Sequence, residues 1–181
     1  MARLRKGVCY RSLERPYTRK SKFSALSFVK MIPHIRISRF ELGNPAKSFS
    51  YRFLVRTKKS LQLRQNALES ARISANKVLE KQLGKDGYFM KLRVYPHHVL
   101  RENPLATGAG ADRMSTGMAH SFGKAIGLSA RVAEGQPVVQ IDVDKEGLVW
   151  AKQAAERIAR KLPCACHIEV LDLKTGREVA V

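Results

Sequence analysis

Side chains of the types used in hydrolytic catalysis gather in the middle of the chain, where Asp112, Ser115, His120 and Ser121 lie within ten residues. Catalysis of this kind needs a nucleophile and a base held together by the fold. These four side chains lie in a glycine-rich stretch, and a flexible loop does not hold the sub-ångström geometry that catalysis requires. The sequence therefore favours polar loop residues over a catalytic triad, and a hydrolytic enzyme remains the alternative.

Two phosphate-binding motifs resemble this glycine-rich stretch, and neither fits it. A P-loop has four residues between its glycines and ends in Lys followed by Ser or Thr. Here five residues separate Gly117 from Gly123, and Ala125 stands at the Ser/Thr position. A dinucleotide fingerprint needs a third glycine three positions after the second. Arg113 stands at that spacing from Gly110, so no nucleotide cofactor is expected.

Potential metal ligands occur at His97-His98 and in the run Cys164-Ala165-Cys166-His167. Structural zinc sites use two chelating pairs, commonly with C-x₂₋₄-C spacing. Cys-x-Cys on a strand points both thiols to one face, and free cysteines are more often buried in a core. We therefore expect neither a metal site nor any other cofactor.

The stretch 101–124 is a long glycine-rich finger with no stable apolar period. Loops longer than about 12–15 residues are uncommon in compact domains and are usually functional or disordered. Glycine lets a backbone approach phosphates and sugars closely. The residues expected to contact a ligand are Arg101, Gly108, Gly110, Asp112, Arg113, Met114, Gly117, Met118, Phe122, Gly123 and Lys124.

The net charge of +19 over 181 residues favours a polyanionic partner, and nucleic acid before membrane. Residues 1–131 hold 27 Lys and Arg against 7 Asp and Glu, whereas residues 132–181 hold 7 against 8. Three cysteines suggest a reducing compartment. No apolar run approaches the ~18 residues of a membrane span, so a cytoplasmic protein is expected.

Residues 1–39 are predicted to form a basic N-terminal arm. They carry 11 Lys and Arg and one acid, with aromatic residues interleaved and no lasting periodicity. Cations neutralise phosphates, and aromatic rings stack on bases. The residues expected to bind RNA are Arg3, Arg5, Lys6, Tyr10, Arg11, Arg15, Tyr17, Arg19, Lys20, Lys22, Arg36 and Arg39 in the arm, and Arg52, Arg56, Lys58, Lys59, Lys91 and Arg93 beyond it. A solvated, disordered tail is the alternative for the arm.

Strands and two amphipathic helices are predicted to hold the finger. Period-two or weak alternation predicts strands at 35–43, 49–57, 88–94, 127–132, 138–143 and 167–173. Steps of three and four predict a helix over 61–83 with Ser60 as its N-cap, and another after Asp144 with a stripe ending at Leu162. Residues 40–181 should thus form an α+β domain, a two-layer, hammerhead-like α/β sandwich with one mainly antiparallel sheet.

Several motifs together resemble a known family. The finger run GAGADRM, STGM, AHSFGK and the following LSARV, the opening RKGVCYR and PYTRK, and the segment KLRVYPHHVLRENP are similar to the archaeal and eukaryotic ribosomal protein L ten-e, whose bacterial relative is L sixteen. The resemblance covers nearly the whole chain. The end at Val181 is more like archaeal members.

The resemblance implies a non-enzymatic constituent of the large ribosomal subunit. It implies binding to large-subunit rRNA beside the 5S rRNA region, contact with neighbouring ribosomal proteins, and late entry into assembly. It also implies that the finger points toward the peptidyl-transferase centre and the A- and P-site tRNAs, with Asp112-Arg113 at its heart. The alternatives are an RNA-modifying or hydrolytic enzyme that uses Asp112, Ser115 and His120, and an extra-ribosomal RNA chaperone or regulator.

Overall fold

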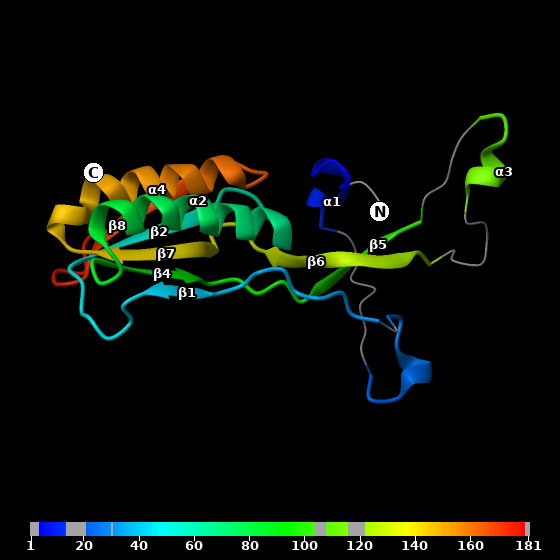
Figure 1. Ribbon diagram of the computed structural model, residues 1–181, viewed down its shortest axis with the longest axis horizontal. Helices are drawn as coiled ribbons and strands as arrows, with labels where there is room; N and C mark the ends of the chain where they lie inside the picture. The colour runs from blue at the N-terminus through cyan, green and yellow to red at the C-terminus, as the bar shows by residue number, and fades with distance from the viewer. Residues whose placement is uncertain (1–3, 14–20, 30, 104–107, 116–121, 180–181) are drawn as a thin grey trace.

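The strands form two antiparallel sheets, shown in the computed structural model of Figure 1. The structure describes residues 4–13, 21–29, 31–103, 108–115 and 122–179. Its elements are α1 (Val8–Arg11), η1 (Ser24–Leu26), β1 (Glu41–Gly43), β2 (Tyr51–Thr57), β3 (Leu61–Arg64), α2 (Gln65–Leu83), β4 (Tyr88–Leu92), β5 (His98–Glu102), α3 (Ala111–Met114), β6 (Lys124–Val132), β7 (Pro137–Val143), η3 (Lys145–Gly147), α4 (Leu148–Lys161) and β8 (Cys166–Asp172). The α+β class and the antiparallel pairing are confirmed.

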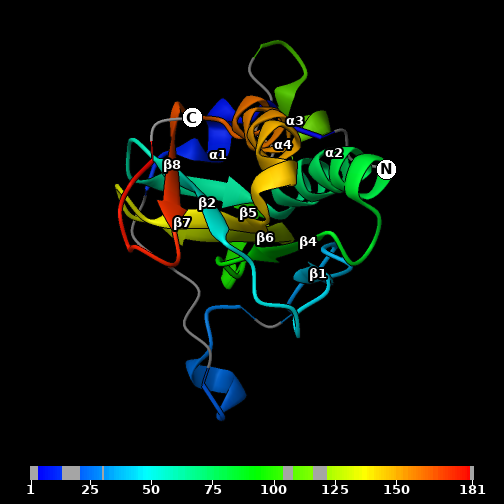
Figure 2. The same ribbon diagram turned by 90° about the vertical axis from the view of Figure 1, so that its left-hand side faces the viewer.

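The larger sheet has the strand order β1-β4-β7-β2-β8, and α2 and α4 pack side by side on one of its faces (Figure 2). The alternation predicted for residues 49–57 decides which side chains meet the helices. Phe53 and Val55 are fully buried in the main core together with Ile141 of β7. Arg52 and Arg56 lie at the alternate positions of β2, so they point to the other face of the sheet.

The predicted helical stripes are confirmed, with small side chains where the helices meet. Ala71 and Ala75 of α2 and Ala151 and Ala155 of α4 are fully buried. Small residues let two helix backbones approach closely, and the larger Ile158 then fills space in the same core. The two helices therefore cover the sheet as one layer.

The start of the first helix was predicted wrongly. Residues Leu61–Arg64 form β3, which pairs with β6 through Leu61↔Val132 and Leu63↔Ala130, and α2 begins only at Gln65. Ser60 is not its N-cap. Leu61 and Leu63 are both buried, as expected for alternate residues of a strand. The prediction placed them in the helix because a short apolar run is compatible with either the helical or the strand period.

The single predicted sheet is also wrong, because β3, β6 and β5 form a second sheet. Residues 98–102, expected to lead into the finger, are the strand β5, and β6 starts at Lys124 rather than at residue 127. β5 and β6 form a long hairpin that extends from the body and carries α3 beyond its end (Figure 1). Both ends of the predicted finger are thus strand residues.

Two further features differ from the prediction. Of residues 35–43 only Glu41–Gly43 form a strand, although Ile37 is buried in the core. Asp144 precedes the short helix η3 and makes no side-chain cap, so its predicted role as the cap of α4 is wrong. Its carboxylate pairs with Lys47 instead.

Candidate nucleic-acid interface

Several predicted RNA-binding residues lie outside the described residues: Arg3, Arg15, Tyr17, Arg19, Lys20, Gly117 and Met118, as well as His120 and Ser121 of the catalytic alternative. The backbone of Met114 is described as the last residue of α3. Among the described positions, some basic side chains are paired with carboxylates and others are not. The unpaired ones are those whose charge is available to a polyanionic partner.

The cations on the strands of the large sheet have partners on the same sheet face. Arg52 donates two hydrogen bonds to Asp142, from Nε at 2.8 Å and from Nη2 at 3.0 Å. Asp142 also accepts a bond from Gln140, whose amide oxygen accepts one from Arg93 at 2.8 Å. The hydrogen bond to Asp142 raises the pKa of Arg52. Arg56 donates from Nε to Glu169 and from Nη1 to the Gly135 carbonyl oxygen.

These pairs change what the sheet offers to a polyanion. Lys91 also has a carboxylate neighbour, Glu41. A cation beside a carboxylate contributes little net field at a distance, although its remaining N–H groups can still donate. The outer face of the large sheet is therefore close to electrically neutral despite its arginines.

The exposed cations without a carboxylate partner among the described residues lie mainly elsewhere. Those predicted from the sequence are Lys6, Arg11, Lys22, Arg36 and Arg39 in the first 39 residues, Lys58 and Lys59 after β2, and Arg113 and Lys124 in the finger. Lys81 and Lys85 near the end of α2 and Arg157 on α4 are exposed in the same way. This charge therefore runs from the arm to the hairpin and also reaches the helix layer.

A groove beside α2 adds two cations that the sequence reasoning missed. It has a volume of about 510 Å³ and is lined by Arg36, Asn66, Glu69, Ser70, Ile73, Ser74, Lys77 and Lys161. Lys77 is exposed on α2, and Lys161 belongs to residues 132–181, whose net charge is close to zero. Only the packing of α4 against α2 brings Lys161 to this groove.

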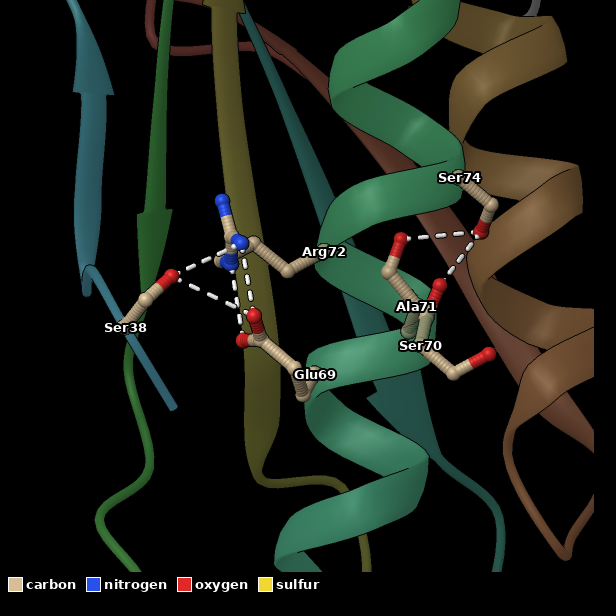
Figure 3. A network of polar contacts seen from close by, with 6 residues as sticks. All are labelled: Ser38, Glu69, Ser70, Ala71, Arg72 and Ser74. Carbon is tan, nitrogen blue, oxygen red and sulfur yellow. Dashed lines mark hydrogen bonds and ion pairs between the residues drawn. The ribbon is translucent and has the colours of Figure 1, made fainter. Parts of the chain in front are cut away.

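The one acid of the groove is already neutralised (Figure 3). Arg72 donates to both oxygens of Glu69, from Nε at 2.8 Å and from Nη2 at 2.7 Å, and Ser38 donates to Glu69 at 3.2 Å. The Ser74 hydroxyl donates to the carbonyl oxygens of Ser70 and Ala71 in its own helix. Arg36, Lys77 and Lys161 thus give the groove a net positive charge.

The Arg72–Glu69 contact predicts a pH-dependent stability. The hydrogen bond from Arg72 lowers the pKa of Glu69, so its stabilisation is present above the unfolded pKa of about 4.3 and is lost as the pH falls through the folded pKa. We expect Glu69→Gln to lower the free energy of unfolding by about 1–3 kcal/mol at pH 7 and by much less at pH 3. Urea unfolding at the two pH values measures both differences.

Glu156→Gln is the matched control for that experiment. Glu156 pairs with Arg160 at 3.7 Å on an exposed helix surface, and such pairs contribute about 0–1 kcal/mol. An equal loss at pH 3 and pH 7 for Glu69→Gln would contradict the ionic origin of the effect.

The start of the chain is attached to the small sheet. The ring of Tyr10 lies 5.8 Å from the Arg64 guanidinium, and Arg64 Nη1 donates to the Arg5 carbonyl at 2.8 Å. Arg5 pairs with Glu102 at the end of β5. Burial is the largest cause of the raised pKa of Tyr10. These contacts hold α1 against β3, so the arm begins next to the root of the finger.

The root of the finger is shaped by Gly123. Its φ of +90° is one that L residues rarely adopt, and an added Cβ would lie 3.2 Å from the Glu102 carbonyl oxygen. Gly108 and Gly110 also have positive φ, of +116° and +77°, next to α3. Asp112 and Arg113 are exposed on α3. These three glycines thus serve backbone turns of the finger, whereas their predicted role in close approach to phosphates stays a prediction.

Cys9 is exposed in α1, whereas Cys164 precedes β8 and Cys166 is its first residue. Cys164 Sγ and Cys166 Sγ are 3.9 Å apart and pack against the main core, and burial raises the pKa of the Cys166 thiol to about 12. His167 is exposed and pairs with Glu178. Within the described ranges, no group of three His, Cys, Asp or Glu side chains is placed to hold a metal ion.

These features define a class of protein, namely a basic α+β protein whose unpaired cations gather on an arm, a helix groove and a projecting hairpin. Within the part of the chain that the structure describes, no helix is long and apolar enough to cross a membrane. A strong, uneven positive charge of this kind suits a polyanionic partner.

Comparison with known proteins identifies the family. The model of the family "Ribosomal protein L16p/L10e" matches residues 13–169. The chain is 44% identical over 168 residues to the large ribosomal subunit protein uL16 of Methanococcus maripaludis, covering 92% of this chain and 94% of the relative. It is 43% identical over 174 residues to uL16 of Staphylothermus marinus, covering 96% and 97%. The chain belongs to the L16p/L10e family of ribosomal proteins.

Membership in this family confirms the resemblance found in the sequence, including its archaeal character, and the expectation of a non-enzymatic structural protein. The uL16 protein of Hyperthermus butylicus is a further similar protein, 43% identical over 165 residues, with 91% of this chain and 88% of the relative covered. The enzyme alternative is thereby wrong. Of its residues, Asp112 is exposed on α3 and Ser115 follows that helix.

Proposed function

We propose that this protein is a constituent of the large ribosomal subunit that binds large-subunit rRNA near the 5S rRNA region. The observation that carries the proposal is the family match over residues 13–169, together with uL16 relatives at 43–44% identity over more than nine-tenths of the chain. Those relatives are named as proteins of the large ribosomal subunit.

The distribution of unpaired cations supports a division of labour within the chain. The arm, the groove beside α2 and the finger neutralise rRNA phosphates, because each contains exposed cations, such as Arg11, Lys77 and Arg113, with no carboxylate partner among the described residues. The large sheet acts mainly as a scaffold and as a contact surface for neighbouring ribosomal proteins. The near-neutral charge of its outer face agrees with that role.

The finger is the part proposed to act in translation. It projects from the body on the β5–β6 hairpin (Figure 1), and few core residues lie beyond the hairpin. We infer that it reaches toward the A- and P-site tRNAs and the peptidyl-transferase centre, and that the protein joins late in subunit assembly. An extra-ribosomal RNA chaperone or regulator would carry the same charges, so residence in the subunit is the property to test.

Reconstitution of large subunits that lack this protein tests the proposal. The full chain should co-sediment with the subunit through a high-salt wash and should restore peptide synthesis. A chain shortened within residues 106–121 should co-sediment equally well and restore synthesis poorly, because the core and the unpaired cations of the body are unchanged. Because electrostatic anchoring weakens with salt, failure of the full chain to co-sediment even at low salt would favour the chaperone, and full activity of the shortened chain would remove the role of the finger.

A further inference from the structure

A small cavity lies where the arm crosses the root of the finger. It has a volume of about 240 Å³ and is lined by Phe28, Val29, Met31, Arg101, Phe122, Gly123, Lys124 and Ala125. We call it the finger-base cavity. Sites for drug-sized ligands enclose about 300–1,000 Å³, so this cavity suits a group no larger than a single base or side chain.

Aromatic rings and a guanidinium form the wall of this cavity. The rings of Phe28 and Phe122 are stacked with centroids 5.9 Å apart and an interplanar angle of 23°. The Arg101 guanidinium lies 3.9 Å from the centre of the Phe122 ring and donates to the Phe122 carbonyl oxygen. A further planar group, such as a base, can stack on an arrangement of this kind.

One lining residue of the cavity, Val29, is buried, and the residue before it, Phe28, is exposed. Val29 is buried in a small core with Val99 and Leu128 of the hairpin, which fixes the arm segment to the sheet. Phe28 remains 52% exposed beside this anchor. A large aromatic ring held rigidly by its neighbour and left half exposed is the arrangement found in base-stacking platforms.

The charge around the cavity favours an anionic occupant. Its lining contains the cations Arg101 and Lys124 and no acidic residue. Glu102, which follows Arg101 on β5, is paired with Arg5. An apolar segment of a protein would gain nothing from the two cations, whereas a nucleotide combines a planar base with a phosphate.

We propose that the finger-base cavity binds one unpaired nucleobase of RNA. The base stacks on the Phe28 ring, and Lys124 neutralises its phosphate. Unpaired bases, unlike bases within a duplex, can be splayed onto aromatic side chains. This inference rests on the proposed function and adds to it a specific contact, which joins the arm and the finger through one nucleotide.

A fluorescence reporter tests the stacking directly. The variant carries Phe28→Trp in a Trp150→Phe background, since Trp150 is the only native tryptophan. A single-stranded oligoribonucleotide with a fluorescein label should quench the tryptophan emission as it binds, with binding followed by anisotropy. A blunt RNA duplex and heparin, each bound to the same occupancy, should leave most of the tryptophan emission unquenched. Equal quenching by the three probes, or binding without quenching, would overturn the proposal.

Phe23→Trp in the same background is the matched control. Phe23 lies in the same segment with 58% exposure but outside the cavity lining. Strong quenching of this control by the single strand would mean that any exposed aromatic of the arm stacks on bases. That result would also overturn the claim for the cavity.

Affinity gives an independent measurement. Phe28→Ala should weaken binding of the single-stranded probe about 5- to 150-fold, the loss expected for one stacked base. Leu26→Ala, at an equally exposed position of the same segment, should change it less than about twofold. Equal effects of the two variants would refute the site. Binding of both variants to large-subunit rRNA, measured in parallel, separates failure of this contact from failure of the proposed function.

Discussion

Raising the salt concentration from about 50 mM to about 200 mM is expected to weaken binding of this protein to large-subunit rRNA by about 10³- to 10⁵-fold. That is the loss expected when 6–10 phosphates are contacted, since each contact releases condensed counterions and steepens the log–log slope by about 0.9 on duplexes. The described chain offers at least that many exposed cations without carboxylate partners, from Lys6 to Lys124. Filter binding over a salt series measures the slope, and a flat response would contradict electrostatic anchoring.

Individual cations can then be assigned by their effect on the slope. Lys77→Ala and Lys161→Ala in the groove beside α2 should each reduce its magnitude by about one. Arg160→Ala is the matched control, because Arg160 is the neighbour of Lys161 on α4 and already pairs with Glu156. If Arg160→Ala reduces the slope as much as Lys161→Ala, the distinction between paired and unpaired cations does not predict RNA contacts.

Phe53→Ala is expected to lower the free energy of unfolding of the isolated protein by about 3–5 kcal/mol. Phe53 is fully buried in the interior strand β2, between Ile141 of β7 and Val170 of β8. Removing the ring forfeits its transfer free energy and leaves a cavity between the sheet and the helices, which close packing cannot refill. A domain of this size has only about 5–15 kcal/mol of stability, so a large part of it would be lost.

Guanidinium unfolding followed by far-UV circular dichroism measures the loss. Val149→Ala is the control, since Val149 is 70% exposed on α4, and surface substitutions usually stay within about 0.5 kcal/mol. A loss below about 1 kcal/mol for Phe53→Ala would mean that the core is not closely packed around β2.

Structural features that depend on residues close together in the sequence could be predicted from it. The alternation of Phe53 and Val55 with Arg52 and Arg56 follows from the two-residue period of a strand, and it assigned the core face correctly. The stripes of α2 and α4 followed from the helical period. The charge asymmetry and the finger motifs, read together, led to the correct family.

Features that depend on pairing between distant residues could not be predicted in this way. Leu61–Arg64 and His98–Glu102 became strands because β6 pairs with both, which made two sheets instead of one. Short segments such as these are compatible with helix, strand or loop, and their hydrogen-bond partners decide among them.

The sequence by itself thus determined the family, the α+β class, the core faces of the long elements and the basic character of the arm and finger. Only the tertiary structure decided which cations are free to meet a partner. It neutralised Arg52 and Arg56 with carboxylates from other strands, brought Lys161 beside Lys77, and placed Phe28 on the root of the finger. The reason is physical: charge and period are local properties of the chain, whereas neutralisation and stacking depend on residues that only folding brings together.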